Sequence, residues 1–215
     1  KEYAKEFTDM PFLVRVEDIN GAVQPGRFLN AKDLGRQEEG ADFHMVLIDE
    51  ITNEIVIPNG TMGERHTNPQ KWNLRLENRD TGAKIDPRLS VFDQREDVTV
   101  VKLPYFGDEE HEGVIERAIP TITVQTVDGP VKVTTVYDLI LANYGIDRGI
   151  GGEVATSYTD DTPYTPTWQE KITGVKADIA IATAREFADN AEKTKGRSMI
   201  IMGGGINHWY HADVI

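Results

Sequence analysis

Short runs of apolar and β-branched residues, separated by turn-forming residues, dominate the first two thirds of the chain and predict strands. Residues 12–16 form one such run, and Asn20-Gly21 shortly after it favours a tight hairpin turn. Residues 71–76 alternate polar and apolar side chains with a period of two, which predicts a half-buried strand. The other predicted strands are 43–48, 54–57, 97–103, 119–127 and 131–133, with predicted turns at 58–60, 80–82 and 127–131.

The pattern changes near Thr134, where apolar residues take up helical spacing. Residues 136–145 predict a helix that ends at Gly145. Thr165 suits the N-cap of a second helix, because Pro166 follows it at the first helical position. Gly174 ends that helix.

A third helix is predicted over 177–194, with Gly196 as its C-terminal cap. Its predicted buried stripe, at three- and four-residue steps, consists of Ile181, Ala184, Ala188 and Ala191. Residues 198–202 then predict a short strand buried on both faces, because 199–202 are all apolar. Three glycines follow this strand directly.

Together these elements predict a mixed α/β fold that is rich in β-structure. A β-rich region of strands and hairpins is expected over 1–133, as an insertion or subdomain. A helical α/β part is expected over 134–215, ending in the strand and the glycine-rich turn.

Composition narrows the classes of function. The 215 residues carry 23 Lys and Arg against 36 Asp and Glu, a net charge of −13, which argues against a nucleic acid partner. The absence of cysteine excludes disulfides, thiol nucleophiles and iron–sulfur clusters held by this chain alone. No stretch approaches the roughly 18 apolar residues of a membrane helix. The chain stops within the aromatic and apolar run 209–215, so we expect it to be a piece of a longer protein.

The glycine turn after the predicted strand is the most suggestive chemical feature. Glycines at a strand end let backbone N–H groups approach phosphates. A dinucleotide fingerprint would need another glycine at position 208, where His208 stands, so an ordinary tight turn is an equal alternative. His208 and His211 would share one helix face, but a stable metal site needs further ligands. A metal held by this chain alone is therefore not expected.

Other polar clusters give weaker signals. The acidic run 108–112 could hold calcium or supply a carboxylate pair, but such runs are usually solvated loops, and Asp160-Asp161 is similar. The serines at 90, 157 and 198 lack the G-x-S-x-G context, so a hydrolase triad has no support.

Several longer motifs resemble the catalytic alpha subunit of respiratory nitrate reductases. The most extensive is 194–211, which includes the glycine turn and the Asn207-His208-Trp209-Tyr210-His211 run. Further segments that resemble this subunit are 26–29, 58–60, 71–74, 104–107, 133–139, 141–145 and 155–158. Segments 164–168, 172–175 and 184–188 are similar to the wider molybdopterin oxidoreductase (DMSO reductase) superfamily. The resemblance covers nearly the whole chain.

The resemblance implies that the chain is an internal slice of a large four-domain α/β enzyme that reduces nitrate to nitrite. In that family the catalytic subunit carries molybdenum bound by two molybdopterin guanine dinucleotides, and an iron–sulfur cluster. Electrons arrive from quinol through an iron–sulfur beta subunit and a membrane gamma subunit. The holoenzyme is therefore expected at the membrane, on its cytoplasmic face, through these partners, with the slice itself soluble.

The same resemblance implies which residues lie near the cofactor. They are Gly203, Gly204, Gly205, Asn207, His208 and His211. Gly204 departs from the alanine expected there. The family's molybdenum-ligating aspartate and its iron–sulfur ligands belong to other segments, so neither catalytic residues nor metal ligands are expected here. Because so large a cofactor needs contacts from several domains, the slice alone should bind no cofactor and be inactive.

Three alternatives remain open. The first is another superfamily member, acting on selenate, chlorate or formate, although the run at 207–211 favours nitrate. The second is a stand-alone acidic β-rich binding module. The third is a dinucleotide-binding enzyme, which the missing glycine opposes. Outside its parent protein the slice would expose Trp209, Tyr210, Val214 and Ile215, which favours dimerisation or a disordered tail.

Overall fold

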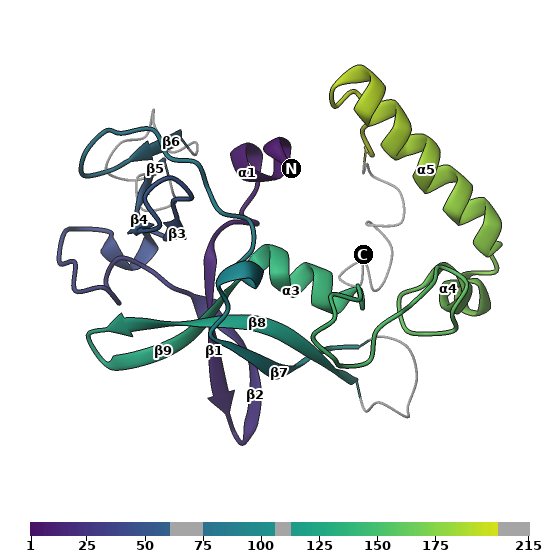
Figure 1. Cartoon of the computed structure of the whole chain (residues 1–215), viewed down its shortest axis with the longest axis horizontal. Coiled ribbons are helices and arrows are strands. Elements are labelled where there is room, and N and C mark those ends of the chain that lie inside the picture. Colours follow the sequence, from purple (N-terminus) through teal and green to yellow (C-terminus); the bar gives the residue numbers. More distant parts are fainter. Residues whose placement is uncertain (61–74, 106–112, 202–215) are drawn as a thin grey trace, which may run out of the picture.

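The structure is a computed structural model that describes residues 1–60, 75–105 and 113–201. Its centre is a five-stranded antiparallel sheet in the order β2-β1-β9-β8-β7 (Figure 1). The strands are β1 (Leu13–Ile19), β2 (Ala22–Phe28), β7 (Asp97–Pro104), β8 (Val114–Thr126) and β9 (Gly129–Thr135). The edge strands β2 and β7 contact each other, so the sheet curls into a half-barrel. The expected mixed α/β, β-rich fold is confirmed.

The hairpin between β1 and β2 turns where the sequence predicts it. Asn20 and Gly21 both have positive φ, 57° and 81°, which matches the primed turns that favour these two residues. The Asp18 carboxylate accepts a hydrogen bond of 2.8 Å from the Gly21 N–H. Ile19 pairs with Ala22 across the turn, which sets the register of the hairpin.

Smaller ladders flank the sheet. They are β3 (Leu47–Ile48) with β4 (Ile55–Val56), and β5 (Pro58–Asn59) with β6 (Arg75–Asn78). The predicted strand 43–48 is shorter than expected, because Phe43 lies in the 3₁₀ turn η1 (Ala41–Phe43). Residues 58–60 are predicted as a turn, but Pro58 also takes part in the β5–β6 ladder, where it pairs with Asn78. Of the strand predicted over 71–76, only the part from Arg75 lies within the described residues.

The main core lies between β1, β9 and the segment that follows β2. Its fully buried side chains include Leu13, Leu29, Val46, Val91 and Val133. A second core lies under α3 (Val136–Asn143), where Leu139 and Ala142 pack over Val101, Ile115 and Ile119 of β7 and β8. This packing fixes α3 on the sheet and directs the chain toward the loop that follows.

The first two predicted helices begin and end within two residues of the predicted positions. Thr135 caps α3 by accepting from the Asp138 N–H at 3.1 Å, and Gly145 has φ of 66° just beyond the helix. Thr165 caps α4 (Pro166–Thr173) in the same way, and Gly174 ends it with φ of 74°. The third predicted helix is α5 (Ala177–Thr194). Two short elements, α1 (Glu2–Phe7) and the 3₁₀ turn η2 (Phe92–Gln94), have no counterpart in the sequence prediction.

An ion network fixes the chain after β2. The buried Asp33 carboxylate accepts from Arg27 at 2.6 Å, Arg15 at 3.2 Å and the Asn30 N–H at 3.0 Å. Burial opposes the ionisation of Asp33, but the hydrogen bonds from Arg27 and Asn30 outweigh it and hold the Asp33 pKa below its ordinary value.

Asp33→Asn should therefore destabilise the chain by about 1–2 kcal/mol at pH 7, because it removes charge-assisted hydrogen bonds. A lowered folded-state pKa stabilises the fold above the unfolded pKa, and this contribution is lost as the pH falls through the folded value. The difference between variant and parent should thus shrink below about pH 4. Urea unfolding at pH 7 and pH 3 measures it, and a difference that grows in acid would contradict the assignment.

Candidate functional site

The residues that the sequence places near a cofactor follow α5 along the chain. They are Gly203, Gly204, Gly205, Asn207, His208 and His211, and all lie outside the described residues. Trp209, Tyr210, Val214 and Ile215, expected to be exposed, lie outside them as well. The structure does describe the helix and the turn that lead to this segment.

The turn after α5 reverses the chain direction. Lys195 takes up a left-handed conformation with φ of 56°, and the Gly196 N–H donates to the Ala191 carbonyl at 2.7 Å. The cap is therefore Lys195, one residue before the predicted Gly196. The Asn190 side-chain amide donates to Ser198 Oγ at 2.8 Å, and Ser198 Oγ donates to the Phe187 carbonyl at 3.0 Å. These bonds hold the returning segment against the last turns of α5.

The strand predicted over 198–202 is not present in its described part. Residues 198–201 pair with no described strand, and Met199, Ile200 and Ile201 are 76%, 78% and 80% exposed. A strand buried on both faces needs neighbouring strands and covering layers. None of the described strands lies beside this segment, which is why the prediction of a buried strand is wrong for the chain alone.

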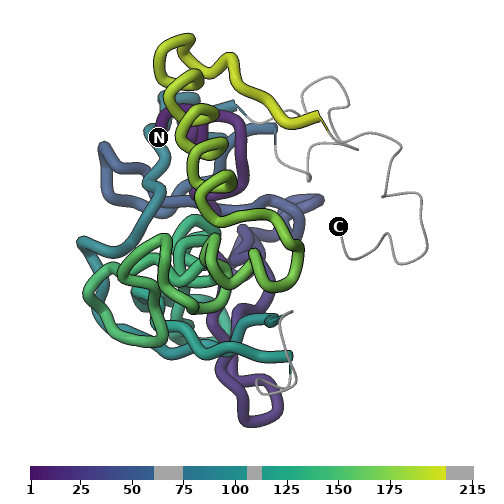
Figure 2. Tube along the Cα trace, turned by 90° about the vertical axis from the view of Figure 1, so that its right-hand side faces the viewer, coloured from purple at the N-terminus to yellow at the C-terminus, as the bar shows by residue number. Residues whose placement is uncertain are grey.

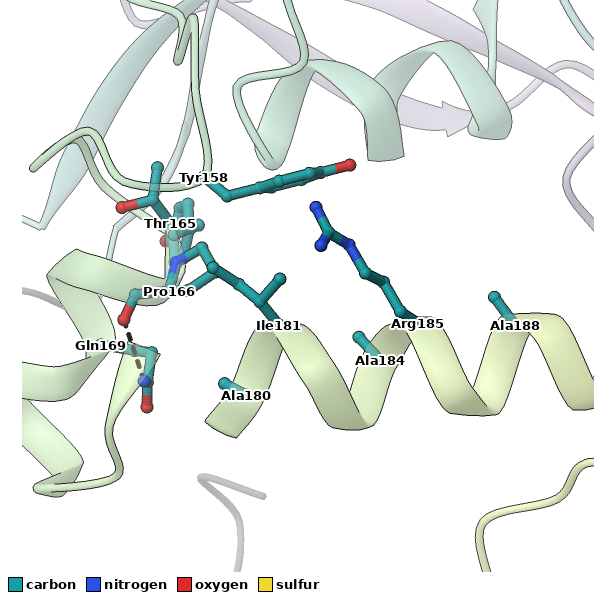
Figure 3. A pocket seen from close by; sticks show the side chains of 10 residues that line it. Tyr158, Thr165, Pro166, Gln169, Ala180, Ile181, Ala184, Arg185 and Ala188 are labelled. Atoms are coloured by element: carbon teal, nitrogen blue, oxygen red, sulfur yellow. Dashed lines mark hydrogen bonds between the residues drawn. The ribbon is translucent and has the colours of Figure 1, made fainter. Parts of the chain in front are cut away.

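The predicted buried stripe of α5 is also incorrect, because the helix contains no buried residue. Ile181 is half-buried and Ala184 and Ala188 are exposed. Instead, Ile181, Ala184 and Ala188 of this stripe line one wall of a cavity of about 420 Å³ between α5, α4 and the preceding loop (Figure 3). The opposite wall includes Tyr158 and Pro166.

Most of the lining of this cavity is apolar. The Arg185 side chain extends from α5 toward the Tyr158 ring, as Figure 3 shows. The Gln169 side-chain amide turns away to donate to the Pro166 and Val175 carbonyls, both at 2.9 Å. The cavity lining contains neither a carboxylate nor a histidine, so it offers a binding surface rather than acid–base chemistry.

A buried polar cluster joins α3 to the loop before η2, and sequence reasoning missed it. The fully buried Asp138 carboxylate accepts from Ser90 Oγ at 2.6 Å, the Val91 N–H at 2.9 Å and Arg148 Nη1 at 2.6 Å. Arg148 also stacks over the Phe92 ring, 4.4 Å from its centroid. The Ser90 hydroxyl donates to the Asp138 carboxylate and accepts from Arg148 Nη2 at 2.9 Å. The arrangement therefore suits a structural clamp and not a nucleophile.

A second buried charge lies under the loop that follows α3. The Arg117 side chain is 1% exposed and donates from Nη1 to the Glu153 carbonyl, with the Glu153 carboxylate 3.7 Å away. Burial lowers the pKa of the Arg117 guanidinium, and the Glu153 carboxylate opposes this shift. Beside it Tyr105, Tyr164 and Trp168 form an aromatic cluster with ring centroids 5.2–6.2 Å apart. This group anchors α4 to the sheet.

Among the described residues, the acidic segments form no metal site. The run 108–112 lies outside the described residues. Asp160 instead closes a local turn, accepting from the Thr156 N–H at 2.7 Å and the Ser157 N–H at 3.0 Å. Within residues 1–60, 75–105 and 113–201, no group of three or more His, Asp or Glu side chains is arranged to hold a metal. Among the helices of this same part, none is long and apolar enough to cross a bilayer.

Comparison with known proteins places this geometry in context. No family model matches the chain. It is 48% identical over its whole length to the nitrate reductase alpha chain of Bacillus subtilis, of which it spans 17%. It is 44% identical, over 99% of its length, to the respiratory nitrate reductase 1 alpha chain of Escherichia coli, of which it spans 18%. Identity to the perchlorate reductase alpha subunit of Dechloromonas aromatica is 28%, over 98% of the chain.

The chain thus spans less than a fifth of the length of these curated relatives. The alignments nevertheless cover nearly the whole of this chain. The resemblance expected from the sequence motifs is confirmed. This chain is therefore homologous, over its whole length, to one segment of the nitrate reductase alpha chains.

Proposed function

We propose that this chain is a segment of the catalytic subunit of a molybdenum-dependent nitrate reductase, which reduces nitrate to nitrite. The observation that carries the proposal is the identity of 40–48% to six nitrate reductase alpha chains from several bacteria. Identity to a perchlorate reductase is much lower, at 28%, which favours nitrate over other oxyanions. A stand-alone binding module has no such support.

In this proposal the cofactor is molybdenum bound by two molybdopterin guanine dinucleotides, and it supplies the redox chemistry. The glycine turn at 203–205 would contribute backbone N–H groups to the anionic cofactor, with Asn207, His208 and His211 as further donors. Because so large a cofactor needs contacts from several domains, we expect the segment alone to bind none and to be inactive.

The proposal extends to partners. Iron–sulfur clusters need ligands that this chain lacks, because it contains no cysteine. Electrons would reach the subunit through an iron–sulfur beta subunit and a quinol-oxidising membrane gamma subunit. These partners would hold the enzyme at the cytoplasmic face of the membrane. We further propose that the chain divides between residues 133 and 134 into a β-rich region and a helical α/β part.

The test uses the full-length subunit, expressed with its partners. Nitrite formation with reduced viologen and a molybdenum content of about one per subunit are expected. His208→Ala and His211→Ala should each lower the molybdenum content or the rate about tenfold or more, since each removes a proposed cofactor contact. Thr183→Ala, an exposed change on α5, serves as the matched control.

Assays with chlorate, selenate and formate separate the neighbouring activities. A higher rate on one of these substrates than on nitrate would replace nitrate in the proposal. A product that lacks molybdenum and forms no nitrite would refute it altogether.

A further inference from the structure

The sequence contains two Asn-Gly pairs, and the structure gives them different surroundings. They are Asn20-Gly21, at the tip of the β1–β2 hairpin, and Asn59-Gly60, at the end of β5. An Asn-Gly bond is chemically reactive, because glycine has no side chain to hinder attack by its backbone nitrogen on the preceding side-chain amide. Which of the two pairs reacts therefore depends on its exposure and on its freedom to move.

The pair at the hairpin tip is open to solvent. Asn20 and Gly21 are both exposed, and a β-carbon added at Gly21 would meet no atom of another described segment within 4 Å. Figures 1 and 2 show this hairpin projecting from the rest of the molecule. Water and the small rotations that the reaction needs therefore have access to this peptide bond.

The second pair is held within the structure. Asn59 pairs with Arg75 of β6, and Gly60 is buried. The reaction closes a five-membered ring, for which the side chain and the following nitrogen must rotate toward each other. A pair fixed in a ladder must first open locally, so it should react more slowly than a pair at a free tip.

A carboxylate restrains the nitrogen that would attack at the hairpin tip. Asp18 Oδ1 accepts a hydrogen bond of 2.8 Å from the Gly21 N–H. This nitrogen must lose its proton before it attacks, and a negative charge beside it disfavours the resulting anion. The same hydrogen bond holds the turn in its left-handed conformation, with φ of 57° at Asn20. Both effects slow the reaction.

We propose that Asn20 is a site of spontaneous deamidation, and that the Asp18 carboxylate limits its rate. The Gly21 nitrogen loses its proton and forms a bond to Asn20 Cγ, while the side-chain nitrogen takes up a proton and leaves as ammonia. One water molecule then opens the cyclic imide at either carbonyl and leaves aspartate or isoaspartate at position 20. The reaction needs neither an oxidant nor a cofactor.

The two products affect the hairpin differently. Aspartate tolerates the left-handed conformation of this position, so the turn is retained. Isoaspartate adds a carbon atom to the main chain, which is incompatible with the pairing of Ile19 with Ala22 that sets the register. The isoaspartyl product should therefore loosen the adjoining ends of β1 and β2.

Peptide mapping by mass spectrometry tests the site in the full-length subunit, incubated with its partners at mildly alkaline pH. Deamidation at Asn20 should accumulate about fivefold or more faster than at Asn59, with isoaspartate among the products. Equal rates at the two positions, or an Asn20 that stays unmodified, would overturn the inference.

Matched substitutions test the restraining carboxylate. Asp18→Ala should raise the deamidation rate at Asn20 about threefold or more, because it removes the charge and the hydrogen bond at the Gly21 nitrogen. Asp128→Ala removes an exposed carboxylate from the β8–β9 hairpin instead and should leave the rate unchanged. An unchanged rate in Asp18→Ala, or an equal rise in both variants, would contradict the role of Asp18. These rates do not depend on nitrate reduction, so either outcome leaves the proposed function unaffected.

Discussion

Replacement of Asp138 by alanine should lower the free energy of unfolding by about 3–5 kcal/mol, the range measured when one partner of a buried ion pair is removed. Asp138 is fully buried, and Arg148 is 14% exposed. Loss of the carboxylate would leave the guanidinium without its counter-charge and the Val91 N–H and Ser90 hydroxyl without their acceptor. Urea unfolding of the chain measures the change.

A double-mutant cycle tests whether this loss of stability comes from the Asp138–Arg148 ion pair. Arg148→Met alone leaves a buried carboxylate that retains the Ser90 and Val91 donors, so its cost should be smaller than that of Asp138→Ala. The double variant Asp138→Ala/Arg148→Met should cost less than the sum of the two single changes, because the charges disappear together. Additive costs would show that the pair is not coupled, and would leave the hydrogen bonds from Ser90 and Val91 as the source of the Asp138 contribution.

The features that the sequence predicted correctly depend on neighbouring residues. The β1–β2 hairpin follows from Asn20-Gly21, whose positive φ values few other residues adopt readily. The ends of α4 follow from Thr165, which accepts from the Trp168 N–H, and from Gly174. Such signals need no knowledge of the tertiary fold, which is why their positions agree with the structure.

The features that it missed depend on contacts between distant segments. β8 begins at Val114, five residues before the predicted start, because its first part pairs with β7 as far as Pro104. Arg117 lies within this stretch, and a charged residue at a buried strand position gives no hydrophobic signal. Asp138 and Ser90 are 48 residues apart, so no local pattern brings them together.

The predicted cofactor segment shows the same difference between signals from neighbouring residues and contacts between distant ones. The glycines at 203–205 and the run at 207–211 are recognisable as a sequence motif, but they lie outside the described residues. The apolar pattern of 198–201 predicts a strand with two covered faces, whereas the described chain leaves Ile200 78% exposed. A strand buried on both faces needs neighbouring strands and covering layers, and none of the described strands lies beside this segment.

Arg117→Ala should destabilise the chain by about 3–5 kcal/mol, the cost of removing a large side chain from a close-packed interior. The Arg117 side chain is 1% exposed and fills the space beneath Gly145, where a β-carbon would lie only 3.2 Å from Nη2. Its hydrogen bond to the Glu153 carbonyl also ties the loop after α3 to β8. Urea unfolding again measures the change.

Arg117→Met separates packing from charge at this position. Methionine retains much of the length of the side chain and removes a buried charge whose Nε and Nη2 have no hydrogen-bond partner among the described residues. Because an unsatisfied buried cation is costly, and a volume-conserving apolar replacement usually costs below about 1.5 kcal/mol, this variant should be nearly as stable as the parent. A loss equal to that of Arg117→Ala would show instead that the ionic contact with Glu153, 3.7 Å away, provides the stabilisation.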